Sequence, residues 1–166
     1  MSTEVTAGYS TDERPLTGYL ALAGLFSTAS LATLAAAASR GRLPERVGVG
    51  DVLLFGTATH KLSRLVARDK VTSFVRAPFT AFEQDAGHGE VDERPRGTGV
   101  RRAIGELVVC PYCLGLWVSA GFHAGRLFAP RATRVVASTF AALTISDVLQ
   151  LAYRELIDAA SDVNST

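Results

Sequence analysis

The chain lacks an excess of charge of either sign, has only two cysteines among 166 residues, and shows no internal repeat. Its formal net charge of +1 leaves no basic surface large enough to follow nucleic-acid phosphates, which excludes a nucleic-acid partner. Two cysteines supply half of the roughly four ligands that a metal site needs. The missing repeat argues against a transport pathway within one chain.

Charge is also absent from long stretches of a chain that is 48% hydrophobic, with a mean hydropathy of +0.20. Leu16 to Ser39 holds no charged residue and is longer than the roughly 20 residues that cross a bilayer. A cleaved signal peptide is the alternative, because Ala35-Ala36-Ala37 resembles a cleavage site. Its apolar core would be about 7 to 15 residues behind a basic flank. The flank here is Asp12-Glu13-Arg14, so the sequence favours a permanent span.

Three weaker apolar segments follow, and we predict an all-α, multi-span helical membrane protein. The four predicted transmembrane helices are residues 16–39, 47–67, 103–128 and 132–153. Asp51 is expected to cap the second. Residues 1–15 and 155–166 are then tails, and residues 16–154 form one membrane domain. The alternative, a soluble helical bundle, would have to bury all these uncharged runs in a small chain.

The distribution of lysine and arginine predicts the orientation. With four spans, 11 of the 17 basic residues lie on one side and six on the other. By the positive-inside rule, both termini and the segment 68–102 face the cytoplasm of a bacterial plasma membrane.

The cytoplasmic segment 68–102 begins with an amphipathic stretch, in which apolar residues recur at helical spacing from Val71 to Phe82. Pro78 predicts a break near Ala77. Residues 84–99 are rich in glycine and charge, which predicts a mobile or hairpin-like loop. The stretch lies either on the inner membrane surface or against the bundle. The residues expected at the membrane surface are Lys61, Arg64, Arg68, Phe74, Phe79, Phe82, Arg101 and Arg102.

The two cysteines form the tetrapeptide Cys110-Pro111-Tyr112-Cys113, which matches the active site of glutaredoxins. A soluble strand-turn-helix unit, which that fold requires, is not predicted here. Three roles stay open for the thiols: packing as small apolar groups, cycling as a dithiol, or supplying half of a metal site.

Depth in the membrane makes a metal site one alternative to a packing role. Cys110 and Asp147 are each seven residues from the cytoplasmic ends of their predicted spans, about 10 Å deep at about 1.5 Å per residue. His60 falls in the same half. Zinc or iron held by Cys110, Cys113, Asp147 and His60 is therefore a candidate; otherwise no cofactor is expected. In the alternative, Asp147 pairs with His60 or a backbone group and locks helices together.

Small residues in the third predicted span predict close helix packing. Gly121 and Gly125 have the G-x-x-x-G spacing, and Gly115 and Ser119 repeat a small-residue interval one turn earlier. The neighbour is either another span of the chain or a second copy, so a homo-oligomer or another membrane protein is a candidate partner beside the lipid bilayer.

Seven short segments together resemble a known family. They are Arg68-Asp69-Lys70-Val71-Thr72, Arg76-Ala77-Pro78-Phe79, Gly89-Glu90-Val91, Pro95-Arg96-Gly97, Arg101-Arg102-Ala103, Gly105-Glu106-Leu107 and the run from Cys110 to Trp117. The resemblance is to domain-of-unknown-function family 1360, over roughly Asp51 to Tyr153. It implies a bacterial membrane protein with several spans and supplies no activity.

From these patterns we expect a structural or partner-binding membrane component, with no catalytic residue identified. The alternative is a membrane thiol-redox or metal-binding protein that uses Cys110 and Cys113.

Overall fold

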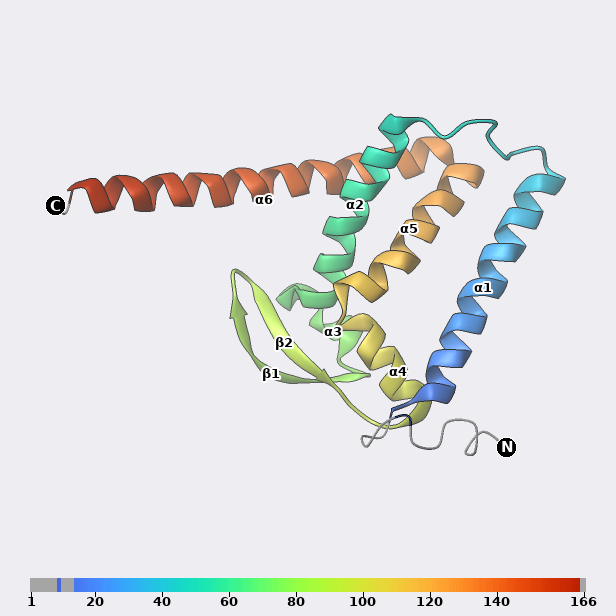
Figure 1. Cartoon of the computed structure of the whole chain (residues 1–166), viewed down its shortest axis with the longest axis horizontal. Helices are drawn as coiled ribbons and strands as arrows, with labels where there is room; N and C mark the ends of the chain where they lie inside the picture. Colours follow the sequence, from blue (N-terminus) through green and yellow to red (C-terminus); the bar gives the residue numbers. More distant parts are fainter. Residues whose placement is uncertain (1–8, 10–13, 165–166) are drawn as a thin grey trace.

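The computed structural model describes residue 9 and residues 14–164, with side chains described to residue 161. Most of the predicted tail 1–15 lies outside these residues, as do Ser165 and Thr166. Figure 1 shows the elements along the chain. Their bounds are α1 (Leu16–Ser39), α2 (Val49–Arg68), a 3-10 turn (Lys70–Thr72), α3 (Ser73–Arg76), β1 (Thr80–Gly87), β2 (Glu90–Pro95), α4 (Gly99–Val108), α5 (Pro111–Phe128) and α6 (Pro130–Asn164).

The chain is mostly helical, but the all-α prediction is wrong because β1 and β2 form an antiparallel hairpin. The predicted break near Ala77 is confirmed, since α3 ends at Arg76 before Pro78. The hairpin turn is His88-Gly89, with φ values of 51° and 82°. Two successive residues with positive φ form the tight turn whose twist matches paired strands. The predicted hairpin-like loop is therefore an ordered hairpin.

Two helices are long and apolar enough to cross a membrane, namely α1 and the part of α6 from Pro130 to Ser161. Four such helices are not found in the described part of the chain. In α2 the second half carries His60, Lys61, Arg64 and Arg68, which lower its hydropathy. A third span exists if the bent pair α4 and α5 counts as one.

The third predicted span is not one continuous helix, because α4 and α5 meet at an angle of 85°. Pro111 has no amide hydrogen to continue α4, and its ring disfavours helical geometry at the preceding residue. Cys110 is accordingly extended, with φ −105° and ψ 104°. Proline is well tolerated at the first position of a helix, so α5 begins there in a new direction.

The fourth predicted span is longer than expected, since α6 has 35 residues and runs through most of the predicted C-terminal tail. Its second half extends beyond the other elements (Figure 1). Every described side chain from Val148 to Ser161 is exposed.

α1, α2 and the bent pair run between two ends of the molecule, whereas α6 leaves one of these ends at a large angle to them (Figure 1). We call the end with the hairpin and the start of α1 the hairpin end, and the end with Arg42, Asp51 and Phe128 the turn end. α1 and the bent pair run together from the hairpin end, where Tyr19 donates a hydrogen bond to Glu106, to the turn end. There, Arg42 Nη1 donates to the carbonyl oxygen of Phe128 at 3.3 Å. α2 runs the opposite way beside α5 and α6.

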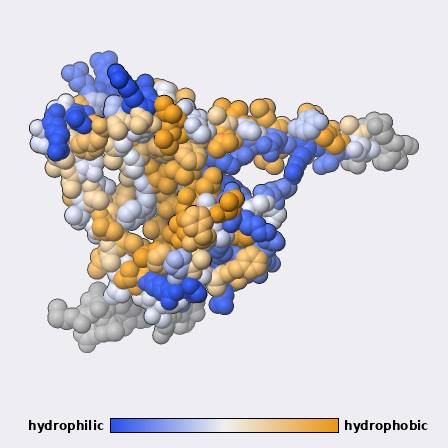
Figure 2. All heavy atoms as spheres, turned by 180° about the vertical axis from the view of Figure 1, so that it is seen from behind, coloured by the Kyte–Doolittle hydropathy of each residue, from blue (hydrophilic) through white to orange (hydrophobic). Residues whose placement is uncertain are grey.

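The apolar core lies where α2, α5 and α6 meet, around Phe55, Ala58, Phe122 and Ala137. The rings of Phe55 and Phe122 stack with their centroids 5.9 Å apart. Outside this core, hydrophobic residues cover much of the outer surface of the helices, as Figure 2 shows. The fold therefore buries few large apolar side chains and exposes many.

Candidate functional site

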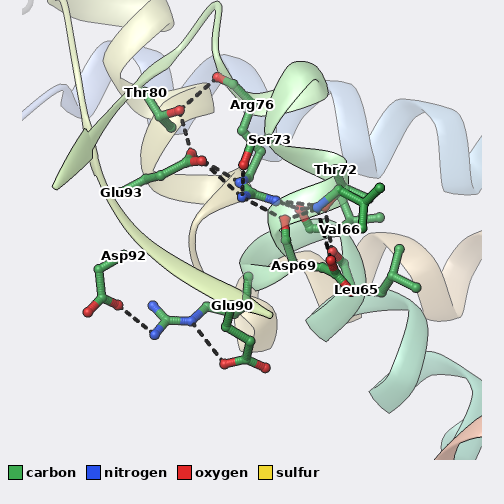
Figure 3. Close-up of polar contacts among 12 residues, drawn as sticks. Leu65, Val66, Asp69, Thr72, Ser73, Arg76, Thr80, Glu90, Asp92 and Glu93 are labelled. Carbon is green, nitrogen blue, oxygen red and sulfur yellow. Dashed lines mark hydrogen bonds and ion pairs between the residues drawn. The ribbon is translucent and has the colours of Figure 1, made fainter. Parts of the chain in front are cut away.

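The hairpin end is organised around Arg76, whose side chain is completely buried. Its guanidinium forms a two-pronged ion pair with Glu93 of β2, with Nη2 2.9 Å from Oε1 and Nε 3.0 Å from Oε2. The Glu93 side chain is only 6% exposed. Figure 3 shows this pair between α3 and the hairpin. Planar, two-pronged geometry is the strongest form of an arginine–carboxylate contact.

The remaining donors of Arg76 go to the end of α2 and the following turn. Nη1 donates to the carbonyl oxygen of Val66 at 2.6 Å, and Nη2 donates to that of Asp69 at 3.0 Å. The last carbonyls of a helix have no partner within the helix. Arg76 therefore supplies donors near the end of α2 and joins it to the hairpin.

Glu93 is held in its charged form. Burial raises its pKa, but hydrogen bonds from Arg76 and from the Thr80 hydroxyl outweigh burial, so the pKa lies below its usual range. Thr80 Oγ1 is 2.6 Å from Glu93 Oε2. A buried carboxylate with this many donors is a structural anchor. The amphipathic pattern from Val71 to Phe82 gave no indication that the polar residues Arg76 and Thr80 are buried.

Three of the residues predicted at the membrane surface lie on α2 and form ion pairs within the chain. Arg64 binds Glu90 with two hydrogen bonds of 2.7 and 2.9 Å, and Arg68 Nη2 lies 2.6 Å from Asp92. The third, Lys61, pairs with α6 and is described below. Hydrogen bonds from Gln84 and Arg68 lower the pKa of Asp92.

The aromatic residues predicted at the membrane surface lie at the hairpin end. Phe74 is 77% exposed and Phe82 63% exposed, whereas Phe79 is half-buried. Arg101 donates two hydrogen bonds to the carbonyl oxygen of Pro78, and Arg102 pairs with Glu106.

Asp147 has a partner that the sequence argument did not consider. Lys61 Nζ lies 2.6 Å from Asp147 Oδ2 and ties α2 to α6. His60 is the preceding residue on α2, and its side chain is exposed. The expectation that Asp147 joins helices holds, but the cation is Lys61 and not His60.

The four candidate metal ligands do not gather in the structure. No group of three or more histidine, cysteine, aspartate or glutamate side chains is positioned to hold a metal ion among the described residues. Cys110 and Cys113 lie at the bend, while Asp147 is engaged by Lys61. The predicted depths of these residues assumed one straight helix from Ala103 to Phe128, whereas the structure has a bend at Cys110.

The cysteine pair shapes the start of α5. Cys110 is its N-cap, and its sulfur accepts the backbone N–H of Cys113 at 3.2 Å. Both are free thiols, with Cys113 exposed and Cys110 partly exposed. The local geometry is therefore compatible with packing, with capping and with thiol chemistry.

The small residues of α5 face different neighbours. Gly115 faces Thr59 and Ser63 of α2, where an added Cβ would lie 3.8 and 3.9 Å from their side chains. Gly125 faces Thr133 of α6, where an added Cβ would lie 2.5 Å from the hydroxyl oxygen. Gly121 meets nothing within 4 Å, and Ser119 is half-buried. The close contacts of Gly115 and Gly125 are thus made within one chain.

An ion cluster at the turn end was missed by the sequence argument. Asp51 is not the N-cap of α2, a position that Gly48 occupies. Its two carboxylate oxygens bind Arg126 of α5 and Arg134 of α6, at 2.7 and 2.8 Å. The predicted topology places Asp51, Arg126 and Arg134 at the same, outer face of the membrane. This shared position could have indicated that the three residues form ion pairs.

A cavity of about 510 Å³ lies at the hairpin end between α2, the hairpin turn and α6. Its polar walls include Lys61, Arg64, Glu90, Asp147 and Arg154. The ion pairs Arg64–Glu90 and Lys61–Asp147 both line this cavity.

The profile of a family described as "Protein of unknown function (DUF1360)" matches residues 54–153. The chain belongs to this family. The match begins within α2 and ends within α6, so it includes the hairpin, the bend and the cavity lining except Arg154, but not α1. The predicted family and its approximate limits are confirmed.

Two relatives come from Bacillus subtilis (strain 168). The chain is 32% identical over 88 residues to the UPF0713 protein YngL, covering 52% of this chain and 65% of that protein. It is 39% identical over 74 residues to the sporulation protein YjcA, covering 43% of this chain and 62% of that protein. The matches thus span less than two thirds of each relative. No solved structure matches the chain.

Proposed function

We propose that this chain is a multi-pass component of the bacterial plasma membrane with a structural or partner-binding role and no enzymatic one. The observation that carries the proposal is the exposure of its most apolar helices. In α1 and α6, only 6% of the best candidate membrane window is buried in the protein. Water would penalise that surface by about 25 cal/mol per Å², whereas lipid would not.

The paired ends of the helices support a multi-pass arrangement. α1 has 24 residues, about 36 Å at about 1.5 Å per residue, which exceeds a hydrocarbon core of about 30 Å. The bent pair runs beside α1 between the same two ends. We place both termini and the hairpin end in the cytoplasm, in accord with the excess of basic residues there.

Binding of a partner is supported by α6. The side chains of Leu149, Leu151, Tyr153, Leu156 and Ile157 are all exposed, with fractions between 46% and 70%. A helix that exposes apolar residues over this length buries them in lipid or against another protein.

The experiment has two parts. Cell membranes are washed at alkaline pH, and the protein is expected to stay in the pellet; release into the supernatant would refute the membrane placement. A reporter that fluoresces only in the cytoplasm is then fused after Thr166 and, separately, into the His88 turn. Both fusions are expected to fluoresce, and a dark fusion would refute the orientation.

The geometry of the cysteine pair favours one second candidate, a thiol or metal centre at the bend. Cys113 is exposed and Cys110 caps α5, so two sulfurs lie together at a helix N-terminus. Zinc or iron would need further ligands from a second chain, because the pair supplies two. Metal analysis of the purified protein tests this: zinc or iron that disappears in Cys110→Ser supports a centre, and metal-free protein removes it. Redox cycling predicts fast thiol labelling in intact membranes.

A further inference from the structure

The cavity at the hairpin end is lined by equal numbers of basic and acidic side chains. Three basic side chains and three carboxylates line it: Lys61, Arg64, Arg154, Asp69, Glu90 and Asp147. Its lining is therefore neutral overall when His88 is neutral. A neutral site with separated charges of both signs complements a zwitterion better than an anion.

Arg154 is the cation of this set that has no carboxylate partner among residues 14–161. Its Nη1 atom lies 2.8 Å from Nδ1 of His88. A guanidinium has only donors, so Nδ1 must accept and His88 does not carry a proton there. The positive charge of Arg154 is thus held in place by the hairpin turn without being neutralised.

Asp147 has one carboxylate oxygen that is available to a cationic group. Lys61 binds its Oδ2 atom at 2.6 Å, whereas Oδ1 has no hydrogen-bond donor in the described part of the chain. The Asp147 side chain is 45% exposed. The cavity therefore holds an unpaired cation on one turn of α6 and an unpaired carboxylate oxygen two turns earlier.

The position of the cavity indicates where its ligand comes from. Leu65 and Leu151 are part of its wall, and the exposed apolar residues of α6 continue beyond it. Val71, Phe74 and Phe82, all strongly exposed, lie at the same end of the molecule. Charged residues beside such an apolar surface are typical of the headgroup level of a bilayer.

We propose that this cavity binds the headgroup of a zwitterionic phospholipid, phosphatidylethanolamine, with its phosphate on Arg154 and its ammonium group on Asp147. The shared chemistry is a phosphate linked to an ammonium group. The source of that group is the membrane, since the apolar wall suits an acyl chain and not a free metabolite. This inference depends on the membrane placement proposed above.

The test uses the purified full chain in a maltoside detergent, with its thermal unfolding followed at increasing ligand concentration. The four probes are dihexanoyl phosphatidylethanolamine, dihexanoyl phosphatidylglycerol, free phosphoethanolamine and inorganic phosphate. We expect the first probe to raise the unfolding temperature most. An equal effect of free phosphoethanolamine or inorganic phosphate would overturn the lipid assignment, as would no effect of any probe.

Variants assign the two charges. Arg154→Gln should weaken the effect of phosphatidylethanolamine on the order of tenfold or more, since it removes a charged hydrogen bond. Arg131→Gln is the matched control, because Arg131 is an exposed arginine near the start of the same helix. Asp147→Asn should abolish the preference over phosphatidylglycerol. An unchanged response in Arg154→Gln would overturn the proposal.

Failure of this inference is distinguishable from failure of the membrane placement. A protein that stays with alkaline-washed membranes but ignores phosphatidylethanolamine retains the placement and loses the headgroup site. A protein that is released from the membranes loses both.

Discussion

α1 and the hairpin end are stabilised by opposite means. Most side chains of α1 are exposed, and Gly18 and Ala37 are the residues of the helix that are buried. At the hairpin end, a fully buried arginine joins α2, α3 and the hairpin through specific hydrogen bonds. A helix satisfies its own backbone and needs only an apolar solvent, whereas a short hairpin needs defined partners.

The two regions also differ in whether the family match includes them. The matched residues 54–153 contain the Arg76–Glu93 pair and the cavity lining except Arg154, but not α1. The polar network thus lies within the shared part of the chain. An apolar helix can be joined to it through few contacts, such as Gly18 against Ala103.

The largest effect is expected from Arg76→Ala, which leaves Glu93 buried without its cation. Breaking a buried ion pair from one side costs about 3 to 5 kcal/mol. The free energy of unfolding, measured by denaturant titration in detergent, should fall by that amount. Arg94→Ala is the control, because Arg94 is exposed and forms a weak surface ion pair with Glu83, with 3.6 Å between Nε and Oε1. Equal losses in both variants would show that the buried pair is not the anchor.

The matching change in α1 is Leu25→Lys, near the middle of the helix, where the leucine is 59% exposed. A lysine at the centre of a span costs about 2.5 to 3.5 kcal/mol of insertion free energy. We expect more of the chain to be released by alkaline washing, while Leu25→Ala stays with the membranes. If Leu25→Lys is retained as well as the wild type, α1 does not lie in hydrocarbon.

Alanine substitutions of two glycines compare a tightly packed position, Gly105, with an open one, Gly121. A Cβ at Gly105 would lie 2.6 Å from the carbonyl oxygen of Phe79, which is backbone and cannot move aside. Gly105→Ala should therefore destabilise the hairpin end by about 1 to 3 kcal/mol, as overpacking does. Gly121→Ala, with nothing within 4 Å, should leave the unfolding temperature unchanged or raise it. The reverse order would contradict the placement of α4 against the hairpin.

The smallest expected effect is a pH dependence from Glu93. Its pKa in the folded state is lowered from the unfolded value of about 4.3. The stability that its ionised form contributes is then complete above about pH 4.3 and is lost as the pH falls through the folded pKa. Between pH 7 and 3, the unfolding temperature of the wild type should fall more than that of Glu93→Gln. Parallel curves would show that Glu93 does not contribute.

Several features of the fold could be predicted because they depend on neighbouring residues. The limits of α1 were predicted as residues 16–39 and are those of the structure, since an uncharged run of that length has one stable conformation in lipid. The end of α3 before Pro78 was predicted from the proline. The bend at Cys110 was missed, although Pro111 carried the same signal.

The candidate site could be predicted only in part. Asp147 was expected to join helices, and it does, but its partner is Lys61 and not the neighbouring His60. Adjacent residues on a helix point about 100° apart, so the choice between them depends on how α2 is rotated against α6. The four candidate metal ligands do not gather among the described residues, and a bend of 85° redirects the helix that carries Cys113.

The sequence by itself determined the apolar helix α1, the break before Pro78, a glycine-rich loop between residues 84 and 99 and membership in the family. Each of these depends on hydropathy or on backbone preferences over a few residues. Only the tertiary structure decided the partners of Arg76, Asp51 and Asp147, and with them the charged cavity. Those pairs join residues 17 to 86 positions apart, and charge attracts any opposite charge. Which pair forms is therefore decided by how the helices pack and not by the residues alone.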